Sequence, residues 1–219
     1  MPNIEYELNE KIHAIIINPY LTWDDFCANC NLIKKYNIKN ISSSLNYLAD
    51  LKNCLGNYSA NLNALISYPL ADLPAAFIEE LVCFAKDKGA NGIEYIPNFI
   101  NLSKKNLDTF AYEIEKIKLS GLPVTIIINK LKLEKKFLHS AIEISQELGI
   151  ESFQFGDGFS PPITSQDVIE ILKIIKNQNQ TKVVGNIKKL TQVIDLLDAG
   201  IDCIGTSNFC EIFQEVKLI

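Results

Sequence analysis

The stretch that decides the fold runs from Lys182 to Ser207 and reads KVVGNIKKLTQVIDLLDAGIDCIGTS. Its β-branched start predicts a strand over Lys182–Gly185. Three apolar residues then recur at helical spacing: Leu190, Val193 and Leu197. Gly200 is suited to end this helix, and a second apolar run predicts a strand over Cys203–Thr206. The stretch is therefore a strand, a helix and a strand, which is the repeating unit of a parallel sheet.

The same alternation of strand and helix occurs eight times along the chain. The expected strands are Ile12–Asn18, Asn40–Asn46, Leu62–Pro69, Gly92–Asn98, Val124–Asn129, Ser152–Gly156, Lys182–Gly185 and Cys203–Thr206. Three more helices carry apolar stripes, formed by Leu73, Phe77, Leu81 and Phe84, by Leu107, Phe110, Ile114 and Ile117, and by Phe137, Ala141, Ile144 and Leu148. Since no linker interrupts the series, it predicts an α/β fold, a closed (β/α)₈ TIM barrel, as a single domain over residues 1–219.

Several helix ends are marked by local chemistry. Thr22 and Thr164 are expected to cap the helices that follow them, and Asp167 completes an acidic capping box with Thr164. Five glycines are expected to end helices, because glycine tolerates the left-handed conformation found there: Gly56, Gly89, Gly121, Gly149 and Gly200.

Composition limits the kinds of partner. The 219 residues are 47% hydrophobic, enough for a full core, and the formal net charge of −5 argues against a nucleic-acid surface. Met1 to Lys11 has no apolar signal core, and no later run approaches the length of a membrane span. We therefore expect a cytoplasmic protein that binds neither nucleic acid nor membrane. Whether it forms a homodimer stays open.

The six cysteines and two histidines do not predict a metal site. Cys27 and Cys30 form a Cys-x-x-Cys motif, but they fall in a helical pattern with no second pair, which favours ordinary helix cysteines over redox or metal chemistry. His13 and His139 are far apart and lack the spacing of metal ligands. We expect no metal and no cofactor.

Glycines and polar residues gather where the expected strands end. In a (β/α)₈ barrel the carboxyl ends of the strands carry the chemistry, and the last turns commonly bind phosphate. Here those turns are Gly156–Gly158, Gly185–Asn186 and Gly205–Ser207. Glycines let backbone N–H groups approach an anion, and Lys188 could neutralise its charge. Taken singly, each glycine could equally be a tight turn, but three such turns together favour a phosphate site.

Several fragments in a shared order give the chain a family resemblance. The fragments are Tyr68-Pro69-Leu70, Gly89-Ala90-Asn91 with Ile93-Glu94, Gly158-Phe159-Ser160, Gly185-Asn186-Ile187, Asp198-Ala199-Gly200 and Ile204-Gly205-Thr206-Ser207. With this spacing the chain resembles the deoxyribose-phosphate aldolase family over roughly Asn18 to Phe209. The resemblance implies a (β/α)₈ barrel and class I aldolase chemistry, in which a lysine forms a Schiff base with the substrate.

The resemblance also implies roles for individual residues. Lys182 stands at the position of the family's second active-site lysine, and Glu94 at that of its proton-relay aspartate. The implied phosphate contacts are Gly158, Gly185, Lys188, Gly205 and Ser207, with Lys188 in place of an arginine. The implied ligand is a small phosphorylated sugar, either deoxyribose 5-phosphate or a related aldehyde phosphate.

The position of the Schiff-base lysine departs from the family pattern, because Gln154 stands there. A primary amine condenses with a carbonyl, whereas the delocalised lone pair of an amide nitrogen does not. The first-strand signatures are also replaced, by His13-Ala14 and Asn18-Pro19, and the fifth-strand one by Asn129-Lys130. We therefore expect a sugar-phosphate-binding, aldolase-like pseudoenzyme that lacks the family's nucleophile.

Other interpretations remain open. Lys182 could itself act as the nucleophile of an active carbon–carbon lyase, and Lys130 is a weaker candidate because it should face away from the barrel interior. Asp157 and Glu94 could form a metal site or an acid/base pair, although Asp157 between two glycines is more typical of a turn. Finally, the barrel could serve as a protein-interaction module.

Overall fold

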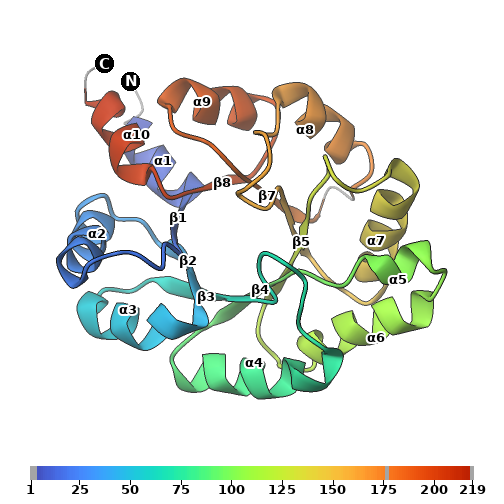
Figure 1. Ribbon diagram of the computed structural model, residues 1–219. Coiled ribbons are helices and arrows are strands. Elements are labelled where there is room, and N and C mark those ends of the chain that lie inside the picture. The colour runs from blue at the N-terminus through green and yellow to red at the C-terminus, as the bar shows by residue number, and fades with distance from the viewer. Residues whose placement is uncertain (1–3, 176–177, 218–219) are drawn as a thin grey trace.

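The computed structural model describes residues 4–175 and 178–217 and has eight parallel strands in a closed barrel. Each strand pairs with the next in chain order, and β8 pairs with β1 (Figure 1). The strands are β1 (Ile12–Ile16), β2 (Asn40–Ser44), β3 (Asn61–Ile66), β4 (Gly92–Tyr95), β5 (Val124–Ile128), β6 (Ser152–Phe155), β7 (Gln180–Val184) and β8 (Cys203–Thr206). The predicted TIM barrel is confirmed.

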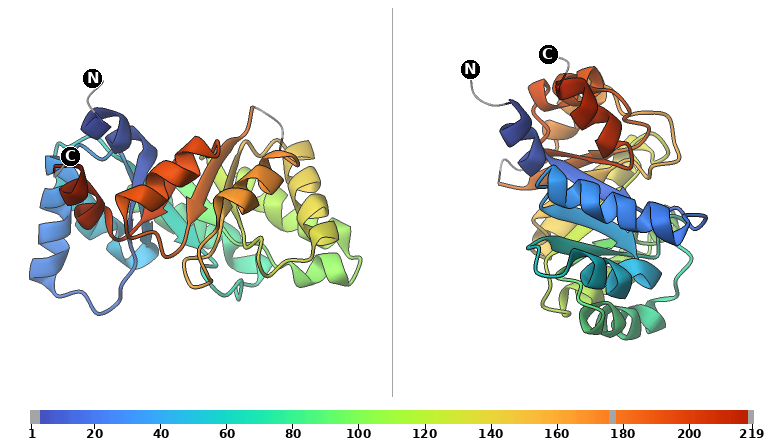
Figure 2. Two further views of the ribbon diagram at one scale, coloured as in Figure 1. Left: turned by 90° about the horizontal axis from the view of Figure 1, so that it is seen from above. Right: turned by 90° about the vertical axis from the view of Figure 1, so that its left-hand side faces the viewer.

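Helices form a ring around the strands (Figure 1). They are α1 (Ile4–Lys11), α2 (Trp23–Lys35), α3 (Leu48–Leu55), α4 (Ile78–Asp87), α5 (Ile100–Ser103), α6 (Leu107–Lys118), α7 (Lys135–Glu147), α8 (Ser165–Leu172), α9 (Leu190–Asp198) and α10 (Phe209–Val216), with 3₁₀ turns η1 (Leu45–Tyr47) and η2 (Ala75–Phe77). The first and last helices, α1 and α10, lie side by side (Figures 1 and 2).

The eight expected strands are all present, but several of their ends differ. The prediction carried β1 to Asn18 and β3 to Pro69, whereas these strands end at Ile16 and Ile66. In the opposite sense, β7 begins at Gln180, before the predicted Lys182. A strand ends where its neighbouring strands no longer offer backbone hydrogen-bond partners. The pattern of apolar residues does not mark that position, so the predicted strand ends are less reliable than the strands themselves.

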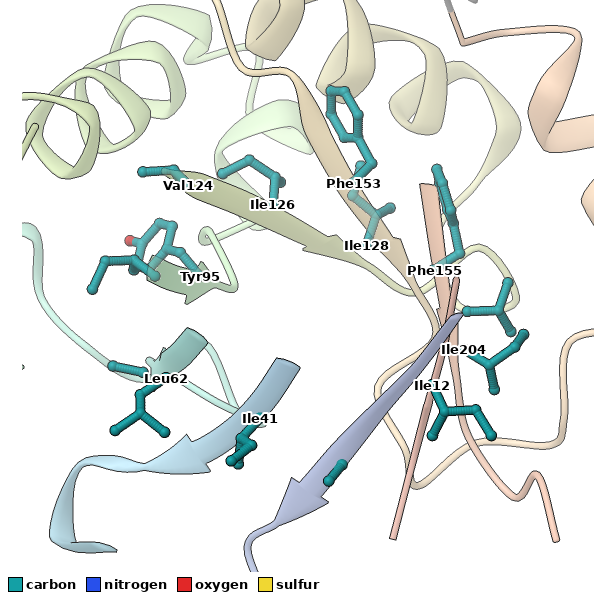
Figure 3. Packing of buried hydrophobic residues seen from close by; sticks show 14 of the residues in the cluster. Ile12, Ile41, Leu62, Tyr95, Val124, Ile126, Ile128, Phe153, Phe155 and Ile204 are labelled. Carbon is teal, nitrogen blue, oxygen red and sulfur yellow. The ribbon is translucent and has the colours of Figure 1, made fainter. Parts of the chain in front are cut away.

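The main core lies between the outer face of the barrel and the helices. Side chains alternate along each strand, so that Ile12 and Ile16 of β1 point to this core while His13 and Ile15 point inward. Figure 3 shows outward-facing side chains from several strands packed together, among them Ile41, Phe153 and Ile204, all fully buried. Burying each such side chain stabilises the fold by about 1.5–3 kcal/mol before the entropy cost is counted.

The apolar stripe predicted for α4 is only partly right, since Leu73 and Leu81 are partly buried against the core. That helix buries Ile78, Val82 and Ala85, whereas Phe77 and Phe84 are 50% and 42% exposed. Both sets recur at helical spacing, so periodicity alone could not choose between them. The other predicted stripes are partly right: Phe110, Ala141 and Val193 are buried, but Leu107 is exposed, and Leu197 and Ile144 are only partly buried.

The predicted helix ends are confirmed. The side chain of Thr22 accepts a hydrogen bond from the N–H of Asp25, and Thr164 and Asp167 form a reciprocal capping box. The five helix-ending glycines all have positive φ angles. Within the described ranges, no helix has both the length and the apolar character needed to cross a membrane.

Candidate functional site

An ion pair lies in the middle of the barrel interior. The ammonium of Lys182, on β7, contacts Oε1 of Glu94, on β4, and the two side chains are 3% and 2% exposed. Ser42 on β2 donates its hydroxyl to the same carboxylate oxygen at 2.7 Å. Because a buried charge is costly unless it is paired, these three side chains stabilise one another as a unit.

Gln154 sits next to this ion pair. It is the register partner of Lys182 on the neighbouring strand β6, and its side chain is 1% exposed. Its amide nitrogen donates to the backbone oxygen of Gly156 at 3.1 Å, while its Oε1 has no partner among the described residues. Position 154 therefore offers the interior an unused hydrogen-bond acceptor, not an amine.

His13 on β1 is a fifth polar group in this part of the barrel interior. Its side chain is buried, and its Nδ1 has no partner among the described residues. Burial, helped by the positive charge of Lys182, holds the pKa of His13 well below its usual range. The imidazole is therefore neutral near pH 7. Besides Gln154 Oε1 and His13 Nδ1, Oε2 of Glu94 is a third buried atom here without a partner among the described residues.

An apolar layer covers the polar groups on the side of the strands' carboxyl ends. Leu65, Ile96 and Ile127 pack together there. Each follows an inward-facing residue by two positions, as Ile96 follows Glu94, so each also points inward but one layer higher. The ion pair is thus separated from the barrel mouth by aliphatic side chains.

The phosphate-binding turns expected from the sequence meet at the mouth. Gly158, Gly185, Gly205 and Ser207 line one cavity of about 70 Å³, together with Tyr68. A Cβ on Gly158 would lie 2.8 Å from the Tyr68 hydroxyl, and one on Gly205 would lie 2.6 Å from Val184 Cγ2. These glycines are therefore needed to leave the cavity open, and α10 begins beside it, directly after Asn208.

Lys188 is not among the residues that line this cavity. It is exposed, and its backbone N–H donates to the side chain of Gln192 at 2.9 Å. The chain contains no arginine that could replace it. Any anion bound in this cavity would therefore rely on backbone N–H groups, hydroxyls and the start of α10 rather than on a lysine side chain.

Asp157 organises the loop between β6 and α8. Its carboxylate accepts hydrogen bonds from Asn129 at 2.7 Å, from Lys132 at 2.8 Å, and from the N–H groups of Phe159 and Ser160 at 3.0 Å each. Burial alone would raise the pKa of Asp157, but these donors lower it below its usual range. The sequence suggested a turn residue here, yet it gave no sign of Lys132 as its partner.

Two alternatives left open by the sequence find no support in the contacts. Lys130 lies outside the barrel interior, where it pairs with Asp167 and Glu170. Asp157 and Glu94 have separate partners, and the residues that the structure describes contain no cluster of three or more His, Cys, Asp or Glu side chains suited to a metal ion. Cys27 and Cys30 lie in α2 as free thiols.

Comparison with known proteins gives a consistent set of relatives. No protein-family model matches the chain. The deoxyribose-phosphate aldolase of Mycoplasma capricolum is 24% identical over 223 residues, covering 98% of this chain and 99% of the relative. That of Dictyoglomus turgidum is 27% identical over 206 residues, covering 93% and 94%.

Solved structures agree on the fold. The deoxyribose phosphate aldolase from Aeropyrum pernix, described as a unique tetramer, superposes with a TM-score of 0.85 at 20% identity and covers 100% of this chain and 94% of its own. An aldolase named QR15 gives a TM-score of 0.89 at 20% identity, covering 96% of each chain. At 20% identity, this likeness concerns the fold alone, which is the barrel and the connections between its strands.

Proposed function

We propose that this chain, a distant member of the deoxyribose-phosphate aldolase family, binds a small phosphorylated sugar without forming a Schiff base at the family's lysine position. The ligand would be deoxyribose 5-phosphate or a related aldehyde phosphate. One observation carries the proposal: the barrel interior presents an amide, Gln154, beside Lys182, while the glycine turns at the mouth keep a cavity open.

The dimensions and chemistry of the mouth cavity support phosphate binding. A volume of about 70 Å³ corresponds to roughly two waters at about 30 Å³ each, a space suited to a phosphate group but not to a whole sugar. Backbone N–H groups of the glycine turns and the positive end of α10 supply donors to the anion. The rest of a sugar would extend out of this cavity across the barrel mouth.

Three features of the interior argue against Schiff-base chemistry. The Gln154 side chain is an amide, which does not condense with an aldehyde. The side-chain nitrogen of Lys182 is held against Glu94 in a buried ion pair, so it is not free to approach an aldehyde. The layer of Leu65, Ile96 and Ile127 also separates Lys182 from a phosphate held at the mouth.

Calorimetric titration with 2-deoxyribose 5-phosphate tests the binding proposal. We expect saturable heat, with inorganic phosphate competing for the same site. Ser207 lines the cavity, so Ser207→Ala should weaken binding about tenfold, the loss expected for one hydrogen bond to a charged group. Ser59→Ala, in the exposed loop before β3, is the matched control and should bind like wild type. No saturable heat with any sugar phosphate would refute the proposal.

One observation favours a second candidate, an active lyase that uses Lys182. This lysine points into the barrel directly beside Gln154, its register partner on β6. Its attack on an aldehyde would first need a proton transfer from the ammonium to Glu94. Covalent capture of the substrate on Lys182 by borohydride would favour this candidate over simple binding.

A further inference from the structure

A second cavity opens at the opposite end of the barrel from the glycine turns. Its volume is about 210 Å³, and it shares no lining residue with the mouth cavity. Its wall includes the first residues of five strands: Asn40, Asn61, Ser152, Gln180 and Cys203. Because all strands are parallel, these residues define the amino-terminal end of the barrel.

Side-chain amides form a hydrogen-bonded row along this cavity. Asn61 donates to Asn40 at 3.0 Å, and Asn91 lies within 3.5 Å of Asn61. Asn63 and Gln180 also line the wall. Each amide group has two donor hydrogens and an acceptor oxygen, so the row retains capacity for further hydrogen bonds.

The inner end of the cavity is formed by His13, Glu94 and Lys182. His13 Nδ1 and Glu94 Oε2 are both buried and have no partner among the described residues. Buried polar atoms nearly always have a partner, so these two atoms indicate a missing one. Because Lys182 balances the charge of Glu94, the missing partner need not be charged.

We propose that this amino-terminal cavity binds a small neutral polyol or sugar of about four carbons. Hydroxyl groups can donate to Glu94 Oε2 and to His13 while exchanging hydrogen bonds with the asparagine amides. The volume fits, since 210 Å³ equals the space of about seven waters at about 30 Å³ each. The site is independent of the phosphate site, because the layer of Leu65, Ile96 and Ile127 lies between them.

The two histidines provide a direct test, because only His13 lines the cavity. The ¹⁵N-histidine spectrum is recorded during titrations with glycerol, erythritol and ribose. We expect a saturable change of the His13 signals with at least one probe, while the His139 signals stay unchanged. Parallel drift of both histidines, or no saturable change with any probe, would mean that the cavity holds only water and would overturn the proposal.

A variant at the entrance separates cavity binding from a surface effect. Gln180 is exposed at the cavity rim, so Gln180→Trp should obstruct entry and weaken the His13 response at least about tenfold. Gln166→Trp, at an exposed position of α8, is the matched control and should respond like wild type. An unchanged His13 response in Gln180→Trp would also overturn the proposal. Titrations with sugar phosphates measure binding at the opposite end of the barrel. Either proposal can therefore fail while the other holds.

Discussion

Lys182 and Glu94 form an ion pair across the barrel interior, although 88 positions separate them in the sequence. The pair joins β7 to β4 and is almost fully buried. The pair lies beside Gln154, and in it the amine of Lys182 is already engaged by a carboxylate. The two buried charges neutralise each other, and an amine held in an ion pair is poorly placed to attack an aldehyde. This agrees better with ligand binding than with nucleophilic catalysis by Lys182.

Breaking this ion pair should cost more stability than removing both partners. Lys182→Met or Glu94→Leu alone leaves an uncompensated buried charge, so each should lower the free energy of unfolding by about 3–5 kcal/mol. The double variant should lose less than either single one. Urea denaturation measures this, with Lys136→Met as control, because the Lys136–Glu134 pair is exposed and should contribute less than about 1 kcal/mol. Single variants within about 0.5 kcal/mol of wild type would contradict the account.

Placing an amine at position 154 should allow covalent capture of an aldehyde. In Gln154→Lys, the new amine would lie beside the Lys182 ammonium, which favours its neutral, nucleophilic form. Borohydride reduction with acetaldehyde, followed by peptide mass spectrometry, should detect an adduct at residue 154. Gln154→Met, similar in length but without an amine, is the control. A folded Gln154→Lys protein without an adduct would show that the glutamine is not what limits the chemistry.

His13 should make stability fall as the pH drops below about 6.5. Burial and Lys182 lower the pKa of the folded-state imidazole from its usual 6.5, so the unfolded chain binds the proton more readily. The contribution is complete above about pH 6.5 and is lost below it, by up to about 1.4 kcal/mol per pH unit. His13→Gln should flatten the profile from urea denaturation, whereas His139→Gln should not. The same slope in His13→Gln would exclude this histidine as the cause.

Replacing Asp157 should lower both the stability of the protein and its affinity for a sugar phosphate. Asp157→Ala removes the acceptor for Asn129, Lys132 and two backbone N–H groups, which should cost about 2–3 kcal/mol of stability. Because Gly158 of the same loop lines the mouth cavity, sugar-phosphate affinity should fall as well. Thermal unfolding and calorimetry measure the two effects. Asp72→Ala, at an exposed position, is the control, and unchanged affinity in Asp157→Ala would refute the link.

Much of the barrel could be predicted from local patterns, because each strand and helix satisfies its own chemistry. Short apolar runs located all eight strands, and Thr164 with Asp167 marked a helix start that the structure confirms. The face of α4 was not predictable, since Phe77 and Phe84 repeat with the same period as the residues that are buried. The extent of the single domain remains a prediction, and one cooperative unfolding transition would support it.

The candidate site was only partly predictable. The resemblance brought Gln154, Lys182 and the glycine turns to notice, and alternation along the strands places the first two inside the barrel. That Glu94 would pair with Lys182 depends on contacts between strands far apart in sequence, which local patterns do not encode. The apolar layer could have been predicted from the sequence, since Leu65, Ile96 and Ile127 each follow an inward-facing position by two residues.

Borohydride reduction of the wild-type protein in saturating 2-deoxyribose 5-phosphate, read by intact-mass spectrometry, tests the central claim most directly. Calorimetry under the same conditions establishes that the ligand is bound. The account predicts bound ligand and a protein of unchanged mass, because Gln154 has no reactive amine and Lys182 is paired with Glu94. A reduced adduct that maps to Lys182 would contradict it and identify an active aldolase with a relocated nucleophile.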